Sequence, residues 1–189
     1  KRQDLHNKHR LVCVYPTFSH VPWYADHPTD LRIRQESHLL EVVVPFVERA
    51  YPVAGQARGR WLVGFSKSGW GAFRLLLRNP DVFGKAAAWD APLGTDTIER
   101  FKIGEIFGTR ENFERYRVAT LLQNRTKDPG DQPRLVLAGA NTFVTEHAAA
   151  HELMTGLGIP HLFHESPKFR HAWDGGWLPQ AVELLAAED

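Results

Sequence analysis

The chain has 189 residues, of which 24% are charged, and its formal net charge is +1. This length fits one domain with a buried core, and the charge gives no basic field for nucleic acid or an anionic membrane surface. A single cysteine, Cys13, excludes a disulfide framework, and no apolar run approaches the roughly 18 residues of a membrane-spanning helix.

Apolar runs of strand length alternate with helical patterns along the chain, which is typical of parallel strands joined by helices. We therefore predict an α/β three-layer sandwich, with a mostly parallel sheet of about five strands and helices on both faces. The expected strands are Leu11–Tyr15, Trp61–Phe65, Lys85–Trp89, Arg134–Gly139 and His161–Glu165. The expected helices are Ile33–Ala50 with a kink at Pro45, Lys67–Asn79, Thr145–Leu157 and Leu178–Ala187.

The stretch 93–132 interrupts this alternation with short helical pieces. An insertion of this kind over the ends of strands often forms a lid or a substrate wall. We predict that residues 1–189 form a single domain that carries 93–132 as a lid-like insertion.

The hexapeptide from Gly64 to Gly69 carries the strongest functional signal. It follows the apolar run Trp61-Leu62-Val63 and precedes a helical stretch, and it holds Ser66 between the small residues Gly64 and Ser68. A buried strand, a tight turn with a serine and then a helix are the context of a nucleophile elbow. The alternative interpretation is a glycine-rich turn with an idle serine.

A serine hydroxyl becomes a good nucleophile only when a base takes its proton. Of the ten histidines, His171 lies in the loop between the last predicted strand and the last predicted helix. That loop reaches the carboxyl edge of the sheet, where Ser66 also lies. We predict that His171 is the base; the alternative is a surface histidine beside Trp173 and Trp177.

With these residues the chain resembles the esterase branch of the α/β-hydrolases, which includes carbohydrate esterases, enterochelin esterases and mycolyltransferases. The resemblance implies an α/β-hydrolase fold without its N-terminal strands, and a serine esterase that needs no cofactor. The matching segments are Val14–Pro16, Trp23–Asp26, Glu36–Pro52, Gly64–Ala72, Asn79–Gly84, His171–Trp173 and Trp177.

The triad acid is the first departure from that family. The family places an Asp or Glu after the strand that ends at Gly139, where this chain has Ala140-Asn141-Thr142. Asp90, at the end of the Lys85–Trp89 strand, and Glu146 are the main candidates, and Asp174 is a weaker one. Asn141 could instead orient the histidine without a charge.

The oxyanion hole is the second departure. The resemblance implies one donor from the backbone N–H of Lys67 and another from a loop after an earlier strand, which has no counterpart before Leu11. In the resembled fold the absent strand lies between Leu11–Tyr15 and the elbow strand. Either the chain is a fragment, or these two strands pair directly. The loop Pro16–Ser19 could supply a donor from Thr17, Phe18 or Ser19.

Aromatic and histidine-rich segments offer further candidates. Trp23, Tyr24 and Trp70 flank the predicted site and could form a substrate wall or part of the core. The histidine pairs His147/His151 and His161/His164 have a spacing that could suit a metal, but we interpret them as surface and strand histidines and predict no metal.

The sequence therefore predicts a serine esterase that hydrolyses a small-molecule carboxylic ester through an acyl-enzyme, with no cofactor. An acyltransferase with the same site, and a non-catalytic hydrolase-like binding module or fragment, remain as alternatives. No feature of the sequence identifies the substrate, the compartment or the oligomeric state.

Overall fold

A four-stranded parallel sheet runs through the computed structural model, which describes residues 4–124, 134–139, 141–165 and 169–187. The strands follow one another in space as in sequence: β1 (Trp61–Phe65), β2 (Lys85–Trp89), β3 (Leu135–Ala138) and β4 (His161–His164). Because neighbouring strands are parallel, each connection crosses back over a face of the sheet. The predicted alternation of strands and helices is confirmed for these four strands.

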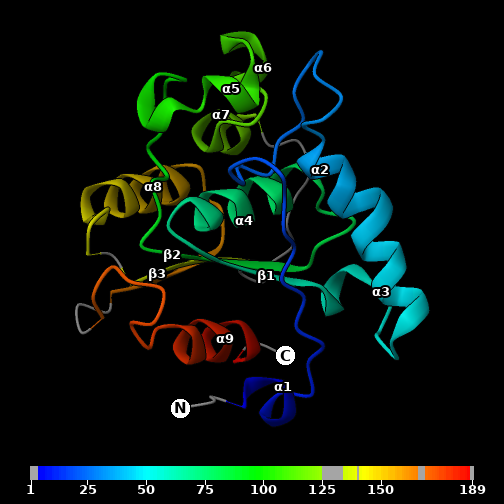
Figure 1. Ribbon diagram of the computed structural model, residues 1–189. Helices are drawn as coiled ribbons and strands as arrows, with labels where there is room; N and C mark the ends of the chain where they lie inside the picture. The colour runs from blue at the N-terminus through cyan, green and yellow to red at the C-terminus, as the bar shows by residue number, and fades with distance from the viewer. Residues whose placement is uncertain (1–3, 125–133, 140, 166–168, 188–189) are drawn as a thin grey trace.

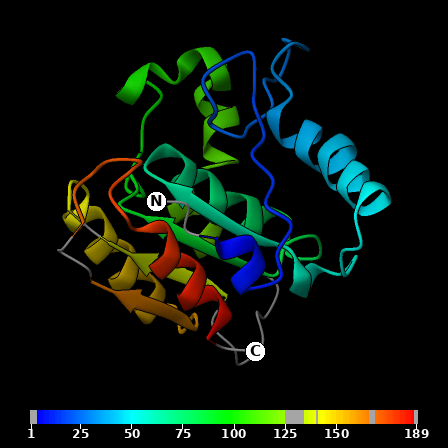
Figure 2. The same ribbon diagram turned by 60° about the horizontal axis from the view of Figure 1, so that its bottom comes forward.

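Helices cover both faces of the sheet, which confirms the three-layer arrangement (Figure 1). On one face lie α4 (Lys67–Arg78) and α8 (Val144–Gly156), and on the other lies α9 (Leu178–Ala186). Each face has its own apolar core, one centred on α4 and the other on the contact between α9 and the strands. The short helix α1 (Leu5–Lys8) lies beside α9, so the N-terminal segment passes across the edge of the sheet (Figure 2).

The predicted first helix forms over Gln35–Ala50, as three consecutive pieces. These are α2 (Gln35–Ser37), the π-helical turn η1 (His38–Val43) and α3 (Val44–Ala50). The widened turn directly precedes Pro45, which lacks the N–H that an α-helical bond at this point requires. Asp26 caps the start of this helix, since its carboxylate accepts hydrogen bonds from the N–H groups of Glu36 and Ser37.

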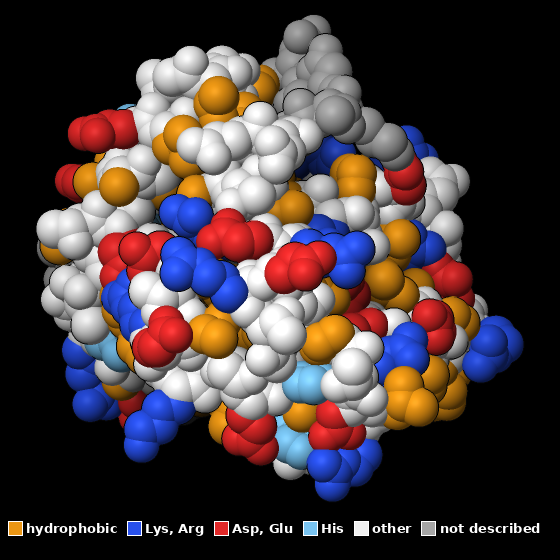
Figure 3. Space-filling model, turned by 90° about the horizontal axis from the view of Figure 1, so that it is seen from above, with side chains coloured by type: hydrophobic (Ala, Val, Ile, Leu, Met, Phe, Trp, Pro, Cys, Tyr) orange, Lys and Arg blue, Asp and Glu red, His pale blue; other side chains and the backbone are white. Residues whose placement is uncertain are grey.

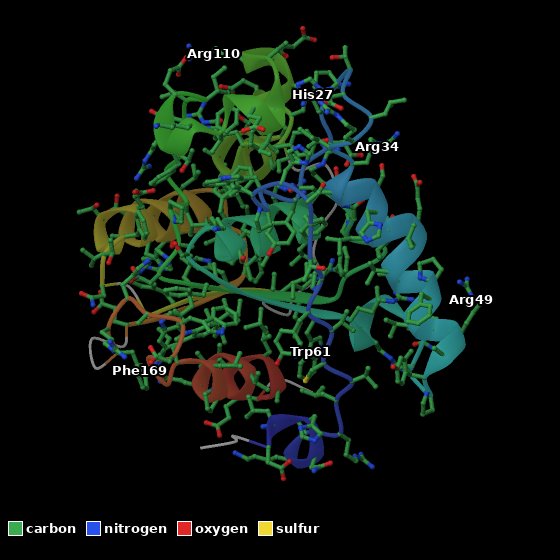
Figure 4. The ribbon with its side chains drawn as sticks, viewed as in Figure 1. His27, Arg34, Arg49, Trp61, Arg110 and Phe169 are labelled. Atoms are coloured by element: carbon green, nitrogen blue, oxygen red, sulfur yellow. The ribbon has the colours of Figure 1, made fainter. Side chains whose placement is uncertain are left out.

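The insertion forms a helical layer above α4 and α8 (Figure 1). Its described part contains η3 (Arg100–Lys102), α5 (Gly104–Phe107), α6 (Arg110–Glu114) and α7 (Val118–Gln123). Phe113 stacks on Trp70 of α4 at 6.5 Å, which fixes this layer to the sheet domain. His27, labelled in Figure 4, lies against the insertion at Gly108. The last residues of the predicted insertion, 125–132, lie outside the described residues.

The prediction of a strand at Leu11–Tyr15 is wrong. The segment is not hydrogen-bonded into the sheet, and Val12, Val14 and Tyr15 are exposed by 41%, 45% and 68%. Cys13 is exposed as well. The sheet therefore has four strands within the described residues, and the direct pairing of this segment with the elbow strand does not occur. A strand needs a neighbour within reach, and a groove separates this segment from β1.

The groove has a volume of about 260 Å³ and is lined mainly by apolar side chains, among them Val12 and Val14 on one side and Leu62 and Val63 on the other. The N–H of Ser66 donates to Trp89 O and the C=O of Arg60 accepts from Gly84 N–H, so the even-numbered residues of this stretch face β2. By alternation, the backbone groups of the odd-numbered residues point toward the groove. Trp61, labelled in Figure 4, begins this open edge.

Charges are mixed on the face of the molecule that Figure 3 shows. Basic and acidic side chains alternate there with apolar ones, without a broad field of one sign on that face. Among the described residues, no helix combines the length and the apolar character needed to cross a membrane.

Candidate active site

Ser66 occupies the turn between β1 and α4 in a conformation that few non-glycine residues adopt, with φ 54° and ψ −127°. Close approach of the strand and the helix requires this turn. A Cβ atom on Gly64 would lie 1.9 Å from the carbonyl oxygen of Ser68, and one on Gly69 would lie 2.7 Å from Cβ of Ala91. The small residues of the hexapeptide therefore serve the geometry that an elbow needs, and Ser66 is held at the tip of a sharp strand-to-helix turn.

His171 lies directly beside this turn. Its ring is 4.6 Å from that of Phe65, the residue before Ser66, and 5.5 Å from that of Phe143. Within the described residues, no direct hydrogen bond joins the Ser66 hydroxyl to His171. Hydrogen bonds of this kind are often long in unliganded enzymes and tighten when substrate binds.

Asp90 is the candidate acid that contacts the histidine. Its Oδ2 lies 2.6 Å from Nδ1 of His171, and its two carboxylate oxygens accept hydrogen bonds from the backbone N–H groups of Asn141, Thr142 and Phe143 at 2.8–3.0 Å. Burial by itself raises the pKa of Asp90, but these four hydrogen bonds outweigh it and hold the pKa below its usual value. The carboxylate thus stays ionised beside the imidazole, and the pairing leaves Nε2 as the ring nitrogen available to a nucleophile.

The other candidate acids lie elsewhere. Glu146 accepts a hydrogen bond from Gly94 N–H and forms an ion pair with Arg100. Asp174 pairs with Arg170 on the surface. Asn141 contributes its backbone N–H to Asp90 rather than its side chain to His171. The family's position for the acid, after β3, thus does not supply the acid here. It supplies the backbone N–H donors that hold Asp90, which follows β2.

The oxyanion side of the site has one candidate donor in place. Lys67 is the first residue of α4, so its N–H has no intrahelical acceptor, and no described residue accepts from it. The loop Pro16–Ser19 makes its contacts elsewhere: Phe18 packs edge-on against Tyr24 and His38, and Ser19 hydrogen-bonds to His20. None of these contacts reaches Ser66.

Two of the three residues predicted to form a substrate wall, Trp23 and Trp70, belong to the core instead. Trp23 and Trp70 are 3% and 0% exposed, because they pack edge-to-face on each other at 5.4 Å in the core under the insertion. Tyr24 is half-buried, and its hydroxyl donates a 2.8 Å hydrogen bond to Oγ of Ser68, two residues after the elbow serine. Tyr24 therefore supports the elbow from the side of the groove.

The interpretation of His147 as a surface histidine is wrong, because the structure places it beside the proposed acid. It is fully buried, and its Nε2 accepts a 2.8 Å hydrogen bond from the backbone N–H of Ala91, next to Asp90. Burial lowers the pKa of His147 to about 4, against smaller raising effects of Asp90 and Glu146. A neutral imidazole thus anchors the chain directly after the carboxylate. No local pattern could have suggested this contact, since Ala91 and His147 lie 56 residues apart in sequence.

Of the other histidines in the two predicted pairs, His151 and His161 contact each other, and His164 contacts Gln180. His151 Nδ1 lies 2.8 Å from His161 Nε2, whose Nδ1 is bonded to Ile159 O. Among the described residues, no group of three or more His, Cys, Asp or Glu side chains is placed to hold a metal ion.

Comparison with known protein families identifies the family of the chain. The Esterase family model ("Putative esterase") matches residues 22–180, which is most of the chain. The chain belongs to the Esterase family. Its match spans the elbow, Asp90 and His171 together. No curated protein sequence is similar enough to count as a relative.

Solved structures of several esterases share the fold. An S-formylglutathione hydrolase from Agrobacterium tumefaciens matches with a TM-score of 0.69 and 16% identity, over 88% of this chain and 62% of its own. A ferulic acid esterase matches with a TM-score of 0.68 and 20% identity, over 87% of this chain and 63% of its own. An S-formylglutathione hydrolase from Staphylococcus aureus matches with a TM-score of 0.68 and 18% identity, over 88% of this chain and 68% of its own. The fold is thus that of α/β-hydrolase-like esterases, and the chain spans less than two thirds of the first two of these structures.

Proposed function

We propose that this chain is the catalytic part of a serine hydrolase that cleaves a carboxylic ester through an acyl-enzyme. The single observation that carries the proposal is the strained Ser66 at the β1–α4 turn beside the Asp90–His171 pair. Strain at a residue of this kind persists only where the surrounding structure enforces it, and it is concentrated at functional sites.

Each residue has a defined role in the proposed reaction. Ser66 Oγ attacks the ester carbonyl while His171 Nε2 takes its proton, and the C–O bond to the alcohol then breaks as the same proton passes to the leaving oxygen. Water repeats the sequence on the acyl-enzyme, which releases the acid and restores Ser66. Asp90 orients the imidazole and stabilises its protonated form, and the Lys67 N–H stabilises the oxyanion.

The turnover of p-nitrophenyl acetate by wild type and Ser66→Ala tests the proposal. We expect Ser66→Ala to lower kcat by about a thousandfold or more, because it removes the hydroxyl at the tip of the turn. Ser68→Ala is the matched control, since it changes a neighbouring serine that faces Tyr24, and it should keep most of the activity. Equal turnover by wild type and Ser66→Ala would overturn the proposal.

The open edge of β1 favours one rival, a hydrolase-like module that binds but does not turn over. In such folds the second oxyanion donor comes from the outer side of the elbow strand, which here faces the groove. Loss of one donor lowers the rate by about a hundred- to a thousandfold. This rival predicts no turnover by wild type and no covalent adduct with a fluorophosphonate. An acyltransferase would use the same residues, and the product formed with an added alcohol acceptor separates it from a hydrolase.

A further inference from the structure

The backbone at Asp90 is strained, and hydrogen bonds hold it on both sides. Its φ is 41°, in the left-handed region that non-glycine residues seldom adopt. The N–H of Asp90 donates to Ala138 O, which holds the residue to β3, and the N–H of Ala91 donates to His147 Nε2. Because the peptide plane that contains the Ala91 N–H rotates with ψ of Asp90, the bond to His147 fixes that angle. Strain of this kind persists only where such neighbours enforce it.

The chain after β2 is clamped to the first turns of α8. The N–H of Ala91 lies 2.8 Å from His147 Nε2, and the N–H of Gly94 lies 2.7 Å from Glu146 Oε2. In the opposite direction, three backbone N–H groups directly before α8 donate to the Asp90 carboxylate. The bond from Ala91 to His147 acts closest to the strained residue, and it therefore bears most directly on where the carboxylate points.

The histidine carries a cost that stability alone does not explain. Because Nε2 accepts a hydrogen bond, the neutral ring of His147 holds its proton on Nδ1. That nitrogen is buried, and no described residue accepts a hydrogen bond from it. The ring thus satisfies the N–H of Ala91 but leaves its own N–H without a described partner, which lowers the net gain. Rules of local stability are broken in this way mainly at functional sites.

We propose that His147 is a positioning residue, which fixes the turn at Asp90 through Ala91 and so directs the carboxylate at Nδ1 of His171. The inference rests on the proposed function. Without the bond to His147 the strained turn relaxes, and the carboxylate no longer lies in line with the imidazole. Ser66 and its neighbours on α4 keep their places, so the loss falls on the activation of the nucleophile and not on the binding of the ester.

Two variants of His147 separate its acceptor from its bulk. His147→Leu fills much of the same space without an acceptor, whereas His147→Gln offers an oxygen to the N–H of Ala91. We expect His147→Leu to lower kcat for p-nitrophenyl acetate by about ten- to a hundredfold with KM unchanged, the range for a small misplacement of a catalytic group. His147→Gln should recover most of that loss. Equal losses in both variants, or a wild-type kcat in His147→Leu, would overturn the inference.

Met154→Ala is the matched control for a general loosening of α8. Met154 is fully buried on the same helix, seven residues after His147, and its truncation leaves a cavity without touching the turn at Asp90. This variant should be less stable than wild type in urea denaturation but should keep the wild-type kcat at a temperature where it is folded. A fall in kcat as large as that of His147→Leu would mean that helix stability alone matters, and would overturn the inference.

Proton NMR provides a readout that needs no turnover. The Nδ1–H of His171 in its 2.6 Å hydrogen bond to Asp90 should give a far-downfield resonance, which His171→Ala removes and thereby assigns. We expect this resonance to keep its position in His147→Gln and to move upfield or vanish in His147→Leu. An unchanged resonance in His147→Leu would overturn the inference whatever the activity. No turnover of any ester by wild type would overturn the proposed function, while the NMR comparison would still decide whether His147 positions Asp90.

Discussion

The two long sides of β1 have opposite surroundings. Its inner side pairs with β2 along all five residues, from Trp61 opposite Lys85 to Phe65 opposite Trp89. Its outer side faces the apolar groove, and no described strand pairs with it. The proposed nucleophile and its base–acid pair depend on the inner side, because Asp90 ends β2 and its N–H donors follow β3. The comparison teaches that this half of the site is held by paired strands and by the segments that follow them.

The largest expected effect concerns the inner side. His171→Ala and Asp90→Asn should each lower kcat/KM for p-nitrophenyl acetate by about a thousand- to ten-thousandfold, since both disturb the base that activates Ser66. Glu146→Gln is the control for the acid and should cost less than tenfold, because Glu146 contacts Gly94 and Arg100 instead. A larger loss in Glu146→Gln than in Asp90→Asn would reverse the assignment. Circular dichroism of each variant checks that the fold is kept.

The next effect concerns the close approach of β1 and α4. Gly64→Ala should lower the free energy of unfolding by about 3 kcal/mol or more, because the new Cβ would lie 1.9 Å from the backbone oxygen of Ser68. Gly156→Ala in α8 is the matched control, since its Cβ would meet nothing within 4 Å, and it should be neutral or stabilising. Urea denaturation measures both. Equal stability of Gly64→Ala and wild type would mean that the turn is looser than described.

The buried His147 should make stability depend on pH. Its pKa falls from 6.5 to about 4 on folding. Between pH 6.5 and pH 4, His147 is therefore protonated in the unfolded chain but neutral in the folded chain. The contribution is fully present above pH 6.5 and is lost as the pH falls to 4, by about 3 kcal/mol in total. Urea denaturation at pH 7 and pH 4 should show a smaller difference in His147→Gln than in wild type. An unchanged difference in His147→Gln would contradict the account.

The smallest effect concerns the outer side of β1. The N–H of Val63 should exchange with solvent deuterium about tenfold faster or more than the N–H of Gly64, because alternation directs the first to the groove and the second to β2. Hydrogen exchange followed by NMR compares the two adjacent residues in one strand. Equal protection would show that something pairs with the outer side, and a dependence on protein concentration would identify a second copy.

Much of the fold could be predicted from the sequence, because local patterns determine it. Four apolar runs with turns at their ends became β1 to β4, and the small residues around Ser66 marked the tight turn. The segment Leu11–Tyr15 has the same apolar character but no partner strand, and a local pattern cannot show whether a partner is within reach.

The candidate site could be predicted only in part. Ser66 and Asp90 directly follow strands, and His171 lies in the loop after the last strand, so parallel topology predicted them at one edge. The geometry favours Asp90 among the acids considered. Trp23 and Trp70 were candidates for contact with substrate because of their sequence neighbours, but distant residues of the insertion bury them. His147 gained its role through a contact across 56 residues, which no local pattern contains.

The account depends on Ser66 being a nucleophile that His171 activates. Reaction with a fluorophosphonate, followed by mass spectrometry of the digested protein, tests this most directly because it needs no knowledge of the substrate. We predict one adduct per chain on the peptide that contains Ser66, and its loss in His171→Ala. An adduct on another serine, or none on the wild-type chain, would contradict the account.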